Sequence, residues 1–264
     1  MIPPTRPETL AQRIALLQPA MSVTKPEGEG PFPVVVLLHG CGGRQDFLDT
    51  YARVVTKAGA VAIVVDSLKP RGISTMMAYG TVCTGLQLWG RQRAGDLYAV
   101  MAWARAQPWA DAQRLYAAGW SHGGWTVIDA LALRSGAEMR RATGLTDLPE
   151  EPLAGLAGCF LAYPYAGRAS FAGRRAWRLT PRTTAIISGR DYIVGATLPR
   201  SALDRLRQGG APIDIHYFAN ATHAFDVPEA LDVRVRYDAT ETARAEALLV
   251  ALIENVNADL SPAH

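Results

Sequence analysis

The chain has 264 residues, of which 49% are apolar and 19% are charged, and its formal net charge is +3. A chain of this length and apolar content can bury one substantial core, so we expect a single domain. The basic surplus is small and scattered along the sequence, which does not favour nucleic-acid binding. No apolar run approaches the roughly 20 residues that a membrane span needs. We therefore expect a small-molecule substrate as the partner, with neither nucleic acid nor a membrane involved.

Residues 1–31 are expected to form an N-terminal extension. They lack the basic and apolar regions of a signal peptide, which predicts a cytoplasmic location unless a leader has been removed. The three cysteines are an odd number without zinc-ligand spacing, so neither a disulfide framework nor a metal site is expected. Cys159 stands in an apolar run and is expected to be a small core residue.

Short runs rich in Val, Ile and Leu alternate with longer segments of helical period. This alternation is typical of βαβ units, and it predicts an α/β fold with a mostly parallel sheet covered by helices on both faces. The expected strands are Val34–Leu38, Val61–Val65, Leu115–Ala118, Leu156–Ala162, Thr183–Ser188 and Ile213–Phe218.

The segments between these strands are expected to be helical, with two exceptions. In the helix after Arg93, Asp96 falls outside the apolar face, and the C-terminal helix is expected to begin at Asp238 or Thr240. Residues 134–152 and 167–181 do not fit the alternation. We expect both to be excursions over the edge of the sheet that could act as a lid.

The strongest motif is GWSHGG at residues 119–124, between a predicted strand and a helical run. In a G-x-S-x-G turn of this kind, a strained backbone lifts the serine hydroxyl above the sheet, and glycines avoid clashes with the neighbouring strand and helix. Ser121 is therefore the candidate nucleophile. A glycine-rich turn with an incidental serine remains the alternative on the pattern alone.

A serine nucleophile needs a base within hydrogen-bond reach and an acid that orients the base. Of the five histidines, two lie in glycine turns, one lies in a predicted strand and one is terminal: His39, His122, His216 and His264. That leaves His223, in a loop just past the last predicted strand, where an open α/β sheet places its ligand-facing residues. The alternative is a surface loop histidine.

Asp191 is the candidate acid because it directly follows the predicted strand Thr183–Ser188 and precedes the histidine in the chain. A salt-bridged turn aspartate is the competing interpretation of Asp191. Asp226 is the reserve candidate, while Asp66 and Asp214 fit the order of serine, acid and histidine poorly.

The oxyanion that forms during acyl transfer needs two backbone N–H donors. One is expected from His122, which follows the nucleophile, and the other from Cys41, in the HGCGG loop after the first predicted strand. This loop lacks the Gly-Lys-Ser/Thr of a phosphate loop and the spacing of a dinucleotide site. A plain turn, or Cys41 acting as a second nucleophile, are the alternatives.

Taken together, these motifs resemble the dienelactone hydrolase family of the α/β-hydrolases. The resemblance runs from Phe32 to the C-terminus and rests on HGCGG, on residues 66–72 and 93–96, on GWSHGG, on GRD at 189–191 and on ATHAF around His223. It implies the α/β-hydrolase fold and a triad. The family typically uses a cysteine nucleophile, so Ser121 favours a general ester over a lactone. The resemblance also raises a Cys41–Cys83 bridge, which a cytoplasmic location disfavours.

The expected reaction is ester hydrolysis through an acyl-enzyme on Ser121, without a cofactor. Trp89, Trp120 and Trp125 could line an acyl pocket or simply pack. Arg71 could bind a substrate carboxylate, although capping of its own loop is the stronger interpretation. A peptidase or acyltransferase with the same triad is the closest rival, and a non-catalytic binding protein on the same scaffold is a more distant one.

Overall fold

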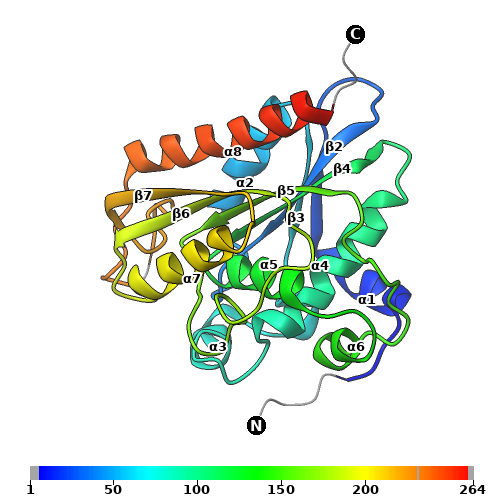
Figure 1. Ribbon diagram of the computed structural model, residues 1–264, viewed down its shortest axis with the longest axis horizontal. Coiled ribbons are helices and arrows are strands. Elements are labelled where there is room, and N and C mark those ends of the chain that lie inside the picture. The colour runs from blue at the N-terminus through cyan, green and yellow to red at the C-terminus, as the bar shows by residue number, and fades with distance from the viewer. Residues whose placement is uncertain (1–5, 231, 261–264) are drawn as a thin grey trace.

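The computed structural model describes residues 6–230 and 232–260. Their core is a seven-stranded sheet with the order β1-β3-β2-β4-β5-β6-β7, in which only the edge strand β1 runs antiparallel to its neighbour (Figure 1). The strands are β1 Met21–Thr24, β2 Phe32–Leu38, β3 Val61–Val65, β4 Ala110–Trp120, β5 Leu156–Ala162, β6 Arg182–Arg190 and β7 Ile213–Thr222. The predicted α/β architecture is confirmed, with all six expected strands present.

Helices cover both faces of the sheet (Figure 1). One face carries α2 Phe47–Lys57 and α8 Ala239–Leu260, and the other carries α1 Leu10–Leu17, α4 Gly90–Arg105, α5 His122–Ala132 and α7 Thr197–Gln208. The shorter helices are α3 Thr75–Thr81 and α6 Ala137–Thr143, and single 3-10 turns span Gln18–Ala20 and Lys69–Arg71. Within the described ranges, no helix is long and apolar enough to cross a membrane.

Alternating side chains of each strand enter the two halves of the core. In β2, Val34, Val36 and Leu38 belong to the cluster with α4 and α5, whereas Val35 and Leu37 belong to the cluster with α2 and α8. All five are fully buried, as expected for parallel strands that are covered on both sides. The carboxyl ends of β2, β4, β6 and β7 are thereby fixed along one edge of the sheet.

Residues 6–31, the described part of the expected N-terminal extension, are more than an extension, while residues 1–5 lie outside the described residues. They contribute α1 and the edge strand β1, and Leu17 is fully buried in the core. Arg13 of α1 is also buried and donates to Asp96 of α4 at 2.7 Å. Asp96 is itself fully buried, so the expectation that it lies off the buried face of its helix was wrong. At the other end, Asp238 caps α8 by accepting from the amides of Thr240 and Glu241.

The two irregular segments lie against the helical layer below the sheet. Residues 134–152 include α6, which packs on α4. In residues 167–181, the Phe171 amide donates to Asp129 of α5 and the Arg178 amide donates to Leu131. A lid role for either segment stays a prediction.

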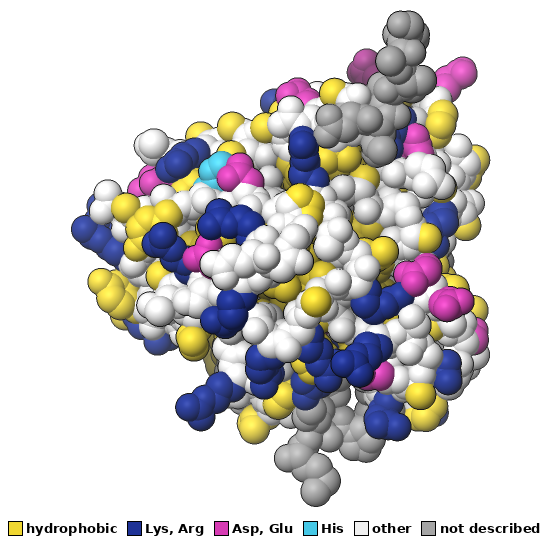
Figure 2. Space-filling view, viewed as in Figure 1, with side chains coloured by type: hydrophobic (Ala, Val, Ile, Leu, Met, Phe, Trp, Pro, Cys, Tyr) yellow, Lys and Arg dark blue, Asp and Glu magenta, His cyan; other side chains and the backbone are white. Residues whose placement is uncertain are grey.

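Basic side chains that are scattered along the sequence gather in space. Figure 2 shows Lys and Arg concentrated over the lower part of the visible face, around the region where Figure 1 places α3 and α6. Two arginines of residues 167–181 are paired, Arg175 with Glu138 and Arg178 with Glu151. The small net charge therefore understates how basic this face is.

Candidate active site

Ser121 occupies a strained turn between β4 and α5. Its φ of 52° and ψ of −109° lie in a region that residues with a side chain rarely adopt. The flanking glycines are needed for close approach: a Cβ on Gly119 would lie 2.4 Å from the Gly123 carbonyl carbon, and a Cβ on Gly123 would lie 2.0 Å from the Leu38 oxygen. The sequence therefore forms the sharp elbow that the motif predicts.

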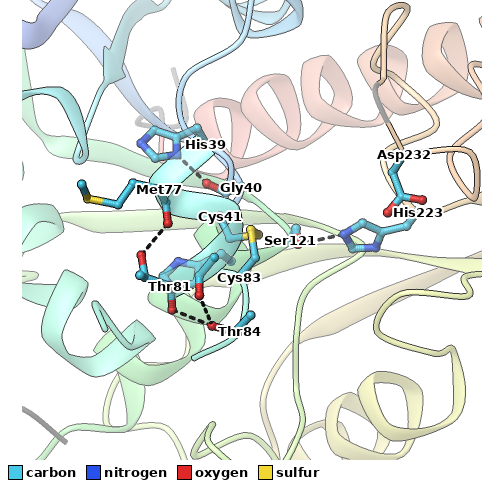
Figure 3. Close-up of a disulfide and its surroundings, with 12 residues drawn as sticks. His39, Gly40, Cys41, Met77, Thr81, Cys83, Thr84, Ser121, His223 and Asp232 are labelled. Atoms are coloured by element: carbon cyan, nitrogen blue, oxygen red, sulfur yellow. Dashed lines mark hydrogen bonds between the residues drawn. A yellow bond between two sulfur atoms is a disulfide. The ribbon is translucent and has the colours of Figure 1, made fainter. Parts of the chain in front are cut away.

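The three predicted triad residues meet at the carboxyl ends of β4, β6 and β7. His223 Nε2 lies 2.8 Å from Ser121 Oγ, and His223 Nδ1 lies 2.7 Å from Asp191 Oδ2. Figure 3 shows the Ser121 and His223 side chains facing each other. His223 is 6% exposed and Asp191 is 8% exposed, so both hydrogen bonds are largely shielded from water.

The surroundings of Asp191 favour its ionised form. Its Oδ1 accepts from the backbone amides of Ile193 and Val194, each at 2.9 Å. Burial alone would raise the pKa of Asp191, but the hydrogen bond and charge of His223 and these two amides outweigh it and lower the pKa. A carboxylate at this position holds the proton of His223 on Nδ1. Nε2 is then left free to accept the Ser121 proton.

The reserve acid, Asp226, forms no hydrogen bond with His223 among the described residues. It accepts from the Tyr51 hydroxyl at 3.0 Å, from Trp120 Nε1 at 2.9 Å and from the Tyr163 hydroxyl. Burial raises the pKa of Asp226 to about 6. The Tyr163 ring lies edge-on to the His223 ring, with centroids 4.8 Å apart. Asp226 therefore supports the wall behind the histidine and does not orient it.

The loop after β2 approaches the nucleophile closely. A Cβ on Gly40 would lie 3.7 Å from the Ser121 Cβ. His39 Nδ1 donates to the Gly40 carbonyl at 2.6 Å, and because C=O and N–H point in opposite directions across a trans peptide, the Cys41 amide points away from His39. In the described part of the chain, neither the Cys41 amide nor the His122 amide has an acceptor. Both residues line the cavity. A role of their amides in binding an oxyanion stays a prediction.

Cys41 and Cys83 form a disulfide, the bridge that the family resemblance raised and that the expected cytoplasmic location disfavoured. Figure 3 shows the bridge beside Ser121, linking the loop after β2 to the segment after α3. The Cys41 sulfur is thus not a free second nucleophile. Cys159 is a buried free thiol of the core, as expected. A cytoplasmic location stays a prediction, and the disulfide weighs against it because such bonds are rare in reducing compartments.

A cavity of about 610 Å³ opens beside Ser121, and one of its walls is aromatic. The Trp125 ring lies 6.1 Å from that of Trp89 and 4.7 Å from that of Tyr165, centroid to centroid. Trp125 Nε1 donates to Asp129 at 2.7 Å and Trp89 Nε1 donates to the Gly85 carbonyl at 2.6 Å, so both indoles are held in place. Trp120 also borders the cavity, but it is 1% exposed and belongs mainly to the core.

Arg71 is not part of the cavity wall. Its guanidinium donates to both oxygens of Asp96, at 2.7 and 3.0 Å, and to the Ser67 carbonyl at 2.5 Å. These bonds occupy the group that would have to bind a substrate carboxylate. The bond to the Ser67 carbonyl agrees with the stronger interpretation, in which Arg71 caps its own loop, and substrate binding by Arg71 stays a prediction.

Sequence reasoning missed several cavity residues. Tyr163 directly follows β5, and Ile193 lies two residues beyond Asp191, so the rule that carboxyl ends of parallel strands meet could have found both. Asp232 and Arg234 form an ion pair at 2.6 Å on the cavity border, in the loop after His223. No pattern in the sequence indicated them.

Comparison with known proteins supports the fold. A dienelactone hydrolase of Klebsiella pneumoniae, so assigned, is 18% identical over 89% of this chain and 92% of its own, with a TM-score of 0.66. Esterase 2 of Thermogutta terrifontis, without ligand, is 14% identical over 92% and 91%, with a TM-score of 0.67. A dienelactone hydrolase-like promiscuous phosphotriesterase from metagenomic libraries is 21% identical over 90% and 99%, with a TM-score of 0.60.

At the level of sequence, the match is partial. The profile of the prolyl oligopeptidase family, Peptidase S9, matches residues 49–137. No curated protein matches the chain. The chain therefore has the α/β-hydrolase fold, and its resemblance to dienelactone hydrolases holds at the level of that fold.

Proposed function

We propose that this protein is a serine hydrolase that cleaves carboxylic esters through an acyl-enzyme on Ser121. The observation that carries the proposal is the unbroken chain of short contacts from Ser121 Oγ to His223 Nε2, at 2.8 Å, and from His223 Nδ1 to Asp191, at 2.7 Å. This is the arrangement that a weak nucleophile needs to lose its proton as it attacks.

In the first half-reaction, the Ser121 oxygen attacks the ester carbonyl carbon and His223 Nε2 takes the hydroxyl proton. The carbonyl oxygen becomes an oxyanion, which the Cys41 and His122 amides would bind. Removal of one such donor typically costs about 10²-fold to 10³-fold in rate. The tetrahedral intermediate then collapses. The alcohol leaves with the proton of His223, and the acyl group stays on Ser121.

In the second half-reaction, water takes the place of the alcohol. His223 accepts a proton from the water as the water oxygen attacks the acyl-enzyme, and the same two amides would bind the second oxyanion. Collapse returns the proton to the Ser121 oxygen and releases a carboxylic acid. Asp191 stays ionised throughout and stabilises the imidazolium that forms twice in each cycle.

An ester is favoured over other acyl compounds by two observations. The cavity beside Ser121 has an aromatic wall, which suits an apolar acyl group. The similar structures include an esterase and two proteins with dienelactone hydrolase in their descriptions. The serine in the elbow, where dienelactone hydrolases typically carry cysteine, favours a general ester over a dienelactone.

A peptidase is the second candidate because the prolyl oligopeptidase family matches residues 49–137. The matched segment includes Ser121 but ends before Asp191 and His223, so it bears on the elbow and the helices around it. Comparison of p-nitrophenyl butyrate with a proline p-nitroanilide would separate the two. We expect the ester to be cleaved with a kcat/KM at least 10³-fold higher, and the reverse preference would favour the peptidase.

The proposal is tested by Ser121→Ala with p-nitrophenyl butyrate. We expect kcat to fall by at least 10⁴-fold because the acyl-enzyme cannot form. Ser201→Ala, on α7 and outside the cavity wall, is the matched control and should retain full activity. More than a few per cent of residual activity in Ser121→Ala would remove Ser121 from the nucleophile role.

A further inference from the structure

A buried cation that is hydrogen-bonded to no carboxylate among the described residues lies behind the loop after β2. Arg93, in the first turn of α4, is 1% exposed. Its Nη1 donates to the His39 carbonyl at 2.7 Å and to His122 Nδ1 at 3.3 Å, and its Nε donates to Ser67 Oγ at 2.9 Å. Among the described residues, no acidic side chain forms an ion pair with Arg93, and its Nη2 has no partner.

The neighbouring carboxylate is already shared by two other arginines. Asp96 accepts from Arg13 at 2.7 Å and from Arg71 at 2.7 Å, and Arg13 is paired with Glu8 as well. Three guanidinium groups are thus packed around two directly bonded carboxylates. Burial lowers the pKa of Arg93 to about 10, which leaves it protonated at neutral pH.

The two histidines that contact this cluster are neutral. His39 Nε2 accepts from the Ser67 amide at 3.1 Å, and His122 Nδ1 accepts from Arg93. Burial, followed by the charge of Arg93, lowers the pKa of both rings, that of His122 to about 3. Arg93 is therefore the positive charge next to both segments that carry the candidate oxyanion amides.

Such an arrangement is costly for stability alone. Taking a charge out of water costs on the order of several kcal/mol, and apolar residues of similar volume often replace even a buried ion pair without loss of stability. The charge of Asp96 offsets part of this cost for Arg93. A fixed positive charge behind an oxyanion hole has the opposite effect on a reaction, because it stabilises the negative charge that develops there and needs no reorganisation. The position of Arg93 matches this second use.

We propose that Arg93 is a positioning residue of the oxyanion hole. This inference rests on the proposed esterase activity. Arg93 bonds the loop after β2 through the His39 carbonyl and the start of α5 through the His122 ring, so that the Cys41 and His122 amides keep one relative geometry. Its positive charge lies outside the cavity wall and stabilises the oxyanion electrostatically. Arg93 does not line the cavity and does not touch the substrate.

The test compares Arg93→Met with Arg71→Met. Arg71 is bonded to the same Asp96 but contacts neither His39 nor His122, so its removal perturbs the same cluster without loosening either amide. With p-nitrophenyl butyrate, we expect Arg93→Met to lower kcat by about 10²-fold with KM within about threefold, the size of effect seen when one oxyanion donor is lost. Arg71→Met should stay within about threefold of wild type in kcat.

A second readout reports the oxyanion directly. A trifluoromethyl ketone with a butyl chain forms a hemiketal oxyanion on the serine, and its inhibition constant should rise in Arg93→Met by the same factor by which kcat falls. Arg93→Lys keeps the charge but replaces the Nη1 and Nε donors with one ammonium group, which cannot hold His39, His122 and Ser67 together. It should lose about tenfold in kcat, and the ketone should weaken equally.

Three results would overturn the proposal. They are full kcat in folded Arg93→Met, an equal loss in Arg71→Met, and a kcat loss without any change in the ketone constant. If Arg93→Met does not fold, Arg93→Lys decides, and wild-type kcat and ketone affinity in that variant would refute the role. An inactive wild type or an active Ser121→Ala would instead refute the esterase activity itself.

Discussion

Asp191 and Asp226 both lie near His223 and both are buried, but their pKa values are shifted in opposite directions. Asp191, after β6, and Asp226, after β7, are 8% and 2% exposed, and each accepts three hydrogen bonds. The pKa of Asp191 is lowered, whereas burial raises the pKa of Asp226 to about 6. The partners make the difference: Asp191 faces a histidine that can become positive, while Asp226 faces hydroxyls and an indole that stay neutral.

This comparison teaches which carboxylate can serve a reaction. An orienting acid must remain ionised while the histidine gains and loses a proton, and only Asp191 contacts the ring. Asp226 instead ties together Tyr51, Trp120 and Tyr163 beneath the site. We therefore expect variants of the two aspartates to separate activity from stability.

The largest effect is expected for Asp191→Asn. The amide would hold His223 in the wrong tautomer, and the loss in kcat for this change in comparable triads is about 10⁴-fold. The measurement is steady-state hydrolysis of p-nitrophenyl butyrate, with circular dichroism to check the fold. If Asp226→Asn lowers kcat more than Asp191→Asn does, the assignment of the orienting acid is wrong.

Asp226→Asn should act mainly on stability. Its amide nitrogen cannot accept from the Trp120 and tyrosine donors, and one unsatisfied buried polar group costs about 1–3 kcal/mol. Urea unfolding should show that loss, with kcat within about tenfold of wild type. Unchanged stability would show that the three donors at Asp226 do not need a carboxylate.

The raised pKa of Asp226 predicts a pH dependence of stability. Between its ordinary value of 3.8 and about 6, the folded protein keeps a proton that the unfolded chain releases. The free energy of unfolding should therefore fall as pH rises through this window, and the Asp226 contribution to the fall should be complete above it. Asp129, whose pKa burial also raises to about 6, adds to the same fall.

Urea unfolding at several pH values between 4 and 7 measures this slope. Asp226→Asn should flatten it but not abolish it, because Asp129 remains. Parallel curves for the variant and the wild type would contradict the pKa shift of Asp226.

The smallest effect is expected for Tyr163→Phe. This change keeps the ring that packs edge-on against His223 but removes the hydroxyl that donates to Asp226. We expect kcat within about threefold of wild type and a loss of about 1 kcal/mol in the free energy of unfolding. A much larger fall in kcat would mean that Asp226 acts on the histidine through Tyr163.

The triad positions could be predicted because they depend on local order. Ser121, Asp191 and His223 each follow a strand of an open parallel sheet, and the carboxyl ends of such strands meet at one edge. The chain order of serine, acid and histidine then favoured Asp191 as the acid, with Asp226 kept in reserve. The structure brings these three residues together, while their catalytic roles stay the proposal tested above.

Other features depend on contacts between distant parts of the chain. Cys41 and Cys83 are 42 residues apart, and nothing local to either cysteine indicates its partner, so only the family resemblance raised this bridge. By its position in the sequence, Asp96 is expected to lie outside the apolar face of α4. It is buried in the structure, where Arg13 donates to it from a segment that was expected to be an extension. The edge strand β1 is four residues long and mostly exposed, so it has too little apolar pattern to be recognised.

The central claim, that Ser121 carries the covalent intermediate, is tested most directly by mass spectrometry after treatment with diisopropyl fluorophosphate. We predict one added diisopropylphosphoryl group on the intact protein, mapped to the peptide that contains Ser121 and absent from Ser121→Ala. An adduct on another residue, or equal labelling of Ser121→Ala, would contradict the account.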